Sequence, residues 1–173
     1  MKKSQKGFTI IEVALVLAIG ALIFLVVFLA VPALQRNQRN DARKRDVSTV
    51  VDAVASFVGN NPTANLADDQ GSHDAIEGET GKGDSSTALG KYIDTVSTNI
   101  ESVVVTKNFS AGDIPASMYT SGSDANNPTK ITVVLGAQCD GTTKIKKGAA
   151  RSTAVIGGVE TTGAAVAYCS SAN

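Results

Sequence analysis

The dominant feature of the hydrophobic pattern lies near the N-terminus. From Phe8 to Val31 the chain reads FTIIEVALVLAIGALIFLVVFLAV and carries a single charged residue, Glu12. A helix that is apolar on every side belongs in a membrane or in a large core. Twenty-four helical residues span about 36 Å, which exceeds the roughly 30 Å of a bilayer's hydrocarbon layer. The pattern therefore predicts a transmembrane helix over residues 8–31.

The pattern changes after this span, although the helix is expected to continue over residues 32–59. A polar, basic stretch runs from Arg36 to Arg45 and is expected to be a solvated face near the membrane rather than a dedicated site for anionic lipid. Apolar residues then recur every three or four positions, which predicts a face that packs on a sheet: Val47, Val50, Val51, Val54, Phe57 and Val58. Gly59 to Pro62 predicts the helix end. Pro32 is expected to kink or loosen the helix.

The rest of the chain, residues 60–173, predicts a globular head. Residues 60–87 are polar and glycine-rich and indicate a long surface loop, followed by a short helix at 89–96. Strands are expected over residues 102–105, 131–135, 142–146, 153–156 and 164–168. Asp140-Gly141 is a hairpin signal between two of them. A long N-terminal helix packed on a small antiparallel sheet is an α+β architecture.

Length and charge narrow the function classes. At 173 residues the chain has room for one modest domain besides the apolar helix. Lys plus Arg and Asp plus Glu number 16 each, so there is no strong overall field that would indicate nucleic acid or an acidic partner. Three of the basic residues, Lys2, Lys3 and Lys6, precede the apolar run. Binding to nucleic acid is left undecided by these numbers.

Residues suited to enzyme chemistry are scarce. The single histidine, His73, lies in the polar loop, and no zinc-protease, serine-hydrolase or phosphate-binding motif occurs. The loop's acidic residues lack the spacing of a calcium-binding EF-hand: Asp68, Asp69, Asp74, Glu77, Glu79 and Asp84. We therefore expect no catalytic, cofactor-binding or metal-binding residues.

Two cysteines, Cys139 and Cys169, lie in the last quarter of the chain. If this region is exported, an oxidising compartment favours a disulfide between them. Closing such a loop would contribute roughly 3 to 4 kcal/mol in the chain-entropy model. The alternative is a pair of buried free thiols.

The apolar run also has other interpretations. It is too long for the core of a secretory signal peptide, and no A-x-A-like cleavage site follows it. A signal anchor that tethers a domain remains open. Charge does not settle orientation, because Lys2, Lys3 and Lys6 favour a cytoplasmic N-terminus whereas the cations between Arg36 and Arg45 favour the reverse.

The residues Lys6-Gly7-Phe8-Thr9-Ile10-Ile11-Glu12-Val13 resemble the processing site of type IV prepilins: a short basic leader ending in Gly, then Phe, then an apolar helix with Glu at its fifth mature position. The resemblance implies that residues 1–7 form a leader peptide. It implies cleavage between Gly7 and Phe8 by a membrane prepilin peptidase, which commonly methylates the new Phe8 amine. It also implies a pilin-like fold and a cytoplasmic N-terminus before cleavage.

Glu12 needs a partner, because an ionisable group inside an apolar span is costly. In the family that partner is the N-terminal amine of a neighbouring subunit. The resemblance thus implies that Glu12 accepts the ammonium of Phe8 in the next copy, and that the pairing selects one axial register. The alternative is a Glu12 that stays hydrated at the level of the lipid headgroups.

The resemblance extends to three further points. Family members carry a proline in this helix, and Pro32 lies a few residues later than the commonest position, so local melting on assembly is a possibility here. A late cysteine pair often ties the last strands of the family to the body, and Cys139 and Cys169 match it. The implied partners are other copies of the chain, the prepilin peptidase, the assembly machinery of the cytoplasmic membrane, and the membrane itself before assembly.

Three functions follow. The first is a structural subunit of an extracellular type IV pilus, used in adhesion, twitching motility or DNA uptake. The second is a pseudopilin or minor pilin of a secretion or competence system. The third is a membrane-anchored binding domain that never polymerises.

Overall fold

The computed structural model describes residues 7–64, 66, 74–77, 80–97, 99–121 and 126–172. Residues 1–6 of the predicted leader, His73, and the acidic residues Asp68, Asp69 and Glu79 lie outside this set. The chain divides into two compact units, Met1–Arg39 and Asn40–Asn173.

The helix α1 runs from Ile10 to Asn60. It ends where the sequence predicts, and the backbone and side-chain nitrogens of Asn61 both donate to the carbonyl of Phe57, at 2.9 and 3.0 Å. The helix continues through Pro32 without a break in secondary structure. A kink or melting at Pro32 therefore stays a prediction.

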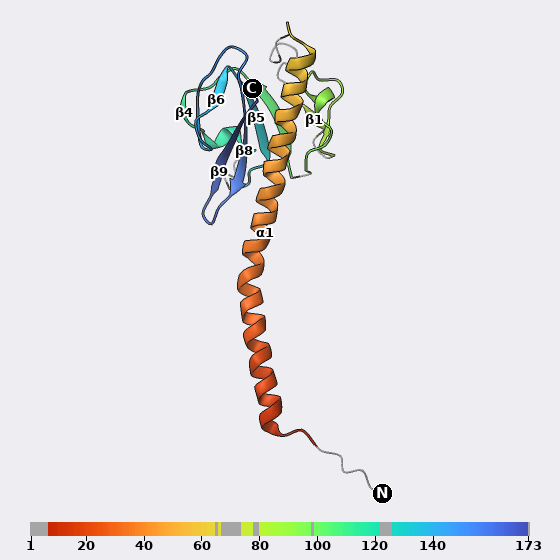
Figure 1. The fold of residues 1–173 in the computed structure, drawn as a ribbon, viewed down its shortest axis with the longest axis vertical. Coiled ribbons are helices and arrows are strands. Elements are labelled where there is room, and N and C mark those ends of the chain that lie inside the picture. The colour runs from red at the N-terminus through yellow and green to blue at the C-terminus, as the bar shows by residue number, and fades with distance from the viewer. Residues whose placement is uncertain are drawn as a thin grey trace. The chain divides into compact units, whose positions relative to one another are not determined.

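The part of α1 that belongs to the second unit packs on a sheet. Val47, Val50, Val54 and Phe57 are buried, as predicted, and Val51 and Val58 are partly buried. Their cluster includes residues from three strands, Val103, Ile131, Val133 and Val155. In Figure 1, β1 and β5 lie on opposite sides of this part of α1. The helix is thus covered on two sides within the head.

The main sheet has four strands in the order β3-β5-β8-β9, with β3 at Ser102–Thr106, β5 at Lys130–Leu135, β8 at Thr153–Glu160 and β9 at Ala165–Ala172. The α+β class is confirmed. The sheet is mixed rather than wholly antiparallel, because β3 and β5 pair in parallel. Residues 107–129 between them include β4 (Gly112–Asp113) and the short 3₁₀ helix η2 (Ala116–Met118). This connection is long enough for the crossover that parallel strands need.

A second sheet of three strands was not anticipated. It has the order β4-β7-β6, with β6 at Ala137–Cys139 and β7 at Lys144–Lys147. Asp140-Gly141 does lie in a hairpin, but it joins β7 to β6 and not to the strand at 131–135. Gly136, at φ +73°, separates β5 from β6, and Gly141 has φ +76° in the hairpin turn. The left-handed conformation at Gly136 lets the chain leave one sheet and enter the next.

Strand β8 is longer than the predicted 153–156, because it continues through Gly157 and Gly158 to Glu160. A Cβ atom on Gly157 would lie 2.5 Å from Cγ2 of Val47, and one on Gly158 would lie 2.7 Å from Cδ2 of Tyr119. The two glycines therefore mark close contacts on the two faces of one strand, which is a known role of glycine inside a sheet. The strand predicted over residues 153–156 was therefore too short.

The segment predicted as a long surface loop contains a hairpin of β1 (Ile76–Glu77) and β2 (Lys82–Gly83). Ala75 and Ile76 are buried against the core of the head. One carboxylate oxygen of Asp74 accepts the backbone N–H groups of Ile76 and Val103, at 3.2 and 2.7 Å, which fixes this segment to β3. The expected short helix is the 3₁₀ helix η1 at Gly90–Tyr92.

Candidate functional site

The predicted processing site lies in exposed backbone just before α1. Gly7, Phe8 and Thr9 are not helical, and all three are exposed, Phe8 to 87%. The first helical residue is Ile10. The peptide bond between Gly7 and Phe8 is thus accessible and lies outside the helix.

Thr9 and Glu12 form a reciprocal pair of hydrogen bonds at the start of the helix. The hydroxyl oxygen of Thr9 accepts the backbone N–H of Glu12 at 3.3 Å, and the carboxylate Oε2 of Glu12 accepts the backbone N–H of Thr9 at 2.9 Å. The Thr9 hydroxyl also donates to the same Oε2 at 2.8 Å. The backbone carbonyl of Thr9 accepts the N–H of Val13 at 3.3 Å. This arrangement is a capping box, with Thr9 as the N-cap and Glu12 at the third helical position.

This capping box was not among the features predicted from the sequence. Its signal was present, since T-x-x-E before an apolar run marks a helix start. Within one chain, the carboxylate predicted to serve assembly therefore also caps its own helix. The predicted pairing of Glu12 with the amine of Phe8 in another copy stays a prediction.

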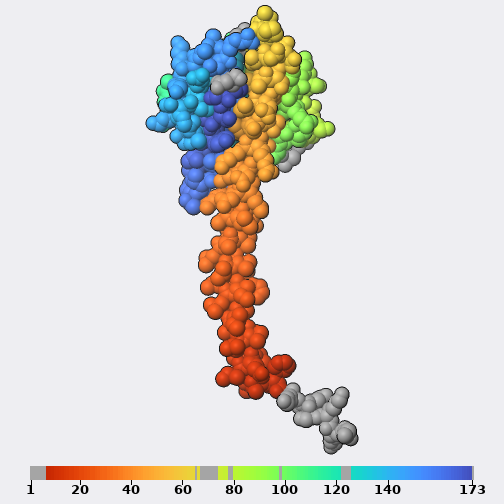
Figure 2. All heavy atoms as spheres, viewed as in Figure 1, coloured from red at the N-terminus to blue at the C-terminus, as the bar shows by residue number. Residues whose placement is uncertain are grey.

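The apolar segment that follows is exposed along its length. The large apolar side chains between Phe8 and Leu34 are at least 40% exposed. Figure 2 shows side chains projecting on both edges of this part of the helix in the view drawn. α1 contains a stretch long and apolar enough to cross a membrane by length and composition. This apolar stretch fits a membrane-anchored precursor.

The basic stretch after Pro32 was expected to be a solvated face, but not all of its side chains are exposed. Arg43 is only 4% exposed, and its guanidinium pairs with Glu160 at the end of β8. The neighbouring Lys44 is exposed, and its ammonium lies 5.9 Å from the ring centre of Tyr168 on β9. For Arg43 the prediction of a solvated face was wrong, because burial against β8 depends on a strand end that the sequence pattern did not place.

Cys139 and Cys169 form a disulfide, with their Cα atoms 5.7 Å apart. It joins β6 of the three-stranded sheet to β9 of the four-stranded sheet. The backbone N–H of Cys169 also donates to the carbonyl of Thr142 at 2.9 Å, next to the same junction. The predicted disulfide is confirmed, and it connects the last strand to the body of the head.

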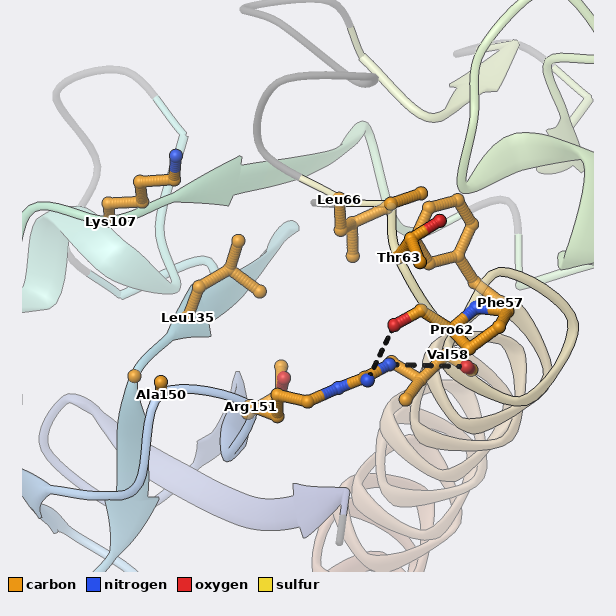
Figure 3. A pocket seen from close by; sticks show the side chains of 12 residues that line it. Phe57, Val58, Pro62, Thr63, Leu66, Lys107, Leu135, Ala150 and Arg151 are labelled. Carbon is orange, nitrogen blue, oxygen red and sulfur yellow. Dashed lines mark hydrogen bonds between the residues drawn. The ribbon is translucent and has the colours of Figure 1, made fainter.

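The head has a cavity of about 440 Å³ near the C-terminal end of α1. Figure 3 shows the side chain of Arg151 reaching across it to the backbone carbonyls of Pro62 and Val58, at 2.6 and 3.5 Å. An arginine at these carbonyls stabilises a helix C-terminus. The described residues that line the cavity include no histidine, cysteine or carboxylate. Among all the described residues, no cluster of such groups could hold a metal ion.

Comparison with known proteins points to the N-terminal segment. The family model for the prokaryotic N-terminal methylation motif matches residues 2–28. Comparisons with curated proteins and with solved structures gave no match. The matched residues contain Gly7, Phe8, the capping box and most of the apolar segment. Proteins with this motif are structural rather than enzymatic. The chain carries the class III signal of type IV prepilins, which indicates a prepilin of the type IV pilin or pseudopilin kind.

Proposed function

We propose that this chain is the structural subunit of an extracellular type IV pilus, cleaved after Gly7 and polymerised through the N-terminal part of α1. The observation that carries the proposal is the methylation motif at residues 2–28 on a helix whose apolar side chains are exposed. Exposed apolar surface on this scale marks a membrane or protein contact. The membrane covers it in the precursor, and neighbouring helices cover it in the filament.

Glu12 supplies the specificity of that assembly. A charged group at the centre of an apolar span costs about 3 kcal/mol on translocon-insertion scales, and Glu12, in the first turn of α1, costs less than that in the membrane. Cleavage creates an ammonium at Phe8, and its attraction to a carboxylate is much stronger in a low-dielectric filament core than in water. A neighbouring copy placed in the correct axial register brings the two charges together. Copies in other registers leave both charges unpaired, which is strongly unfavourable.

The first experiment is mass spectrometry of the mature protein from cells. The proposal expects a chain that begins at Phe8, with or without a methyl group on its amine. A chain that still begins at Met1 would instead support the tethered binding domain. Material sheared from the cell surface then separates a major pilin, abundant in long filaments, from a pseudopilin or minor pilin.

The second experiment compares Glu12→Gln with Glu77→Gln by electron microscopy of sheared filaments. Both changes remove one exposed carboxylate, and Glu77 lies in the β1–β2 hairpin of the head. The proposal expects filaments from Glu77→Gln and none from Glu12→Gln. Normal filaments from Glu12→Gln would rule out the pairing of Glu12 with Phe8.

A further inference from the structure

We propose that the Thr9 hydroxyl positions the Gly7–Phe8 peptide bond for the prepilin peptidase, by fixing Ile10 as the first residue of α1. This inference rests on the proposed cleavage after Gly7. It assigns to Thr9 a role in processing that is separate from the role of Glu12 in assembly. Thr9 is a positioning residue here, because it acts through the backbone conformation of its neighbours.

The apolar sequence alone does not say where the helix starts. Phe8 and Thr9 can both adopt helical backbone, and Gly7 opposes it only weakly. What distinguishes Thr9 is its set of hydrogen bonds: its side chain satisfies the N–H of Glu12, which has no partner four residues earlier in the helix. The capping box therefore decides the helix start.

The start position matters because the bond to be cut lies two residues before it. Extension of the helix by two or three residues would place Phe8 and then Gly7 in helical backbone, with their carbonyl groups engaged in helical hydrogen bonds. Fraying by one turn would move the bond farther from the membrane-inserted part of the chain. Either change alters the segment that the peptidase must bind, whereas the capped state keeps Gly7 to Thr9 exposed and non-helical.

The role of the Thr9 hydroxyl can be tested by substitution. It accepts from the backbone of Glu12 and donates to the side chain of Glu12. Valine has the shape of threonine without the hydroxyl, and serine keeps the hydroxyl without the methyl group. The pair Thr9→Val and Thr9→Ser therefore separates the hydrogen bonds from the side chain's bulk.

The experiment uses the full-length precursor in detergent micelles, mixed with a prepilin peptidase, and follows leader release by mass spectrometry. Losing an N-cap typically shifts the helix-start equilibrium about fivefold, so Thr9→Val is expected to be cleaved about fivefold more slowly. Thr9→Ser is expected to be cleaved within about twofold of the unaltered rate. Thr49→Val, the same change farther along α1, is the matched control and leaves the rate unaltered.

Hydrogen exchange of the Glu12 amide in the uncleaved precursor reports the cap itself. Exchange is expected to be faster in Thr9→Val and close to unaltered in Thr9→Ser. Cleavage of Thr9→Val at the unaltered rate, or of Thr9→Ser as slowly as Thr9→Val, overturns the inference. Slow cleavage of Thr9→Val with unaltered amide exchange also overturns it, since the peptidase would then contact the hydroxyl directly.

Glu12→Gln separates the two proposals. Glutamine can take the place of glutamate in a capping box, so the Glu12→Gln precursor is expected to be cleaved between Gly7 and Phe8, whereas filaments are lost with the charge. Filaments from Glu12→Gln contradict the assembly pairing and leave the role of Thr9 standing. Absence of cleavage between Gly7 and Phe8 in the unaltered precursor contradicts the proposed function itself.

Discussion

The Nη1 atom of Arg43 lies 2.5 Å from Oε1 of Glu160, and this ion pair joins α1 to the end of β8. One turn earlier on the helix, the side-chain amide of Asn40 pairs with the backbone of Glu160. The amide oxygen accepts the N–H of Glu160 at 2.7 Å, and the amide nitrogen donates to the carbonyl of Glu160 at 2.8 Å. Asn40 and Arg43 thus fix one strand end to the first turns of the helix in the head.

Removing one partner of this pair should destabilise the head. Glu160→Ala leaves the buried guanidinium of Arg43 without its carboxylate, and we expect the free energy of unfolding to fall by about 2 to 3 kcal/mol, less than for a fully buried pair because Glu160 is partly exposed. Urea unfolding of the full chain in micelles, followed by circular dichroism, measures this. Glu77→Gln serves as the control.

Replacing both partners should cost much less. The Nε atom of Arg43 has no hydrogen-bond partner among the described residues, so the burial of its charge is incompletely compensated. The double change Arg43→Met with Glu160→Leu is expected to be neutral or stabilising relative to the unaltered chain. The backbone pairing with Asn40 survives it. A double variant as unstable as Glu160→Ala would show that the ion pair contributes net stability.

The disulfide should be a major source of stability in the head. Cys139 and Cys169 are 30 residues apart, and opening a loop of this length is expected to cost about 3 to 4 kcal/mol. The comparison is between the oxidised chain and Cys139→Ala with Cys169→Ala, by urea unfolding in micelles. Equal stability of the two would mean that the packing of β6 on β9 already suffices.

Gly157 should not tolerate a side chain. The Cβ atom of Gly157→Ala would lie 2.5 Å from Cγ2 of Val47, so α1 and β8 must move apart, at a cost of about 1 to 3 kcal/mol. Gly163→Ala, in the turn between β8 and β9, meets nothing within 4 Å and is the matched control. Adding Val47→Ala to Gly157→Ala should restore part of the loss. Thermal unfolding of these three variants and of the unaltered chain checks all three expectations.

The two compact units should differ in solubility, with the need for detergent confined to the N-terminal unit, Met1–Arg39. Among the described residues of 40–173, Val166 is the one exposed large apolar residue, with 37% of its surface accessible. We expect a chain of residues 40–173 to remain monomeric in water without detergent, and the full chain to require detergent. Sedimentation of both at matched concentration tests this. Association of the shorter chain in the absence of detergent would instead place a polymerisation surface in the head.

Local signals predicted the features that depend on neighbouring residues. The end of α1 at Asn60 follows from Gly59 and Pro62, and the buried helix face follows from the spacing of Val47, Val50, Val54 and Phe57. The methylation motif was recognisable because charge, glycine, phenylalanine and an apolar helix occur in a fixed order. Even the capping box had a local signal in Thr9 and Glu12, although it was overlooked.

Long-range contacts decided what the sequence pattern could not. The parallel pairing of β3 with β5 depends on the path of residues 107–129, and β6 is a strand only because β7 folds back on it. The strand predicted over residues 153–156 continues through Gly157 and Gly158 because both residues pair with β9. Arg43 reads as one more cation of a basic stretch until Glu160, 117 residues later, is placed beside it.

The sequence by itself determined that this chain carries a prepilin motif and an apolar helix long enough to cross a membrane, because glycine, phenylalanine, glutamate and apolar length all act within about one span of helix. Only the tertiary structure decided how the head is assembled: which strands pair, where the arginine is buried, and which sheet the disulfide joins to which. Those outcomes depend on the packing of segments far apart in the chain, and the free energy of a buried contact belongs to both partners rather than to either residue's local pattern.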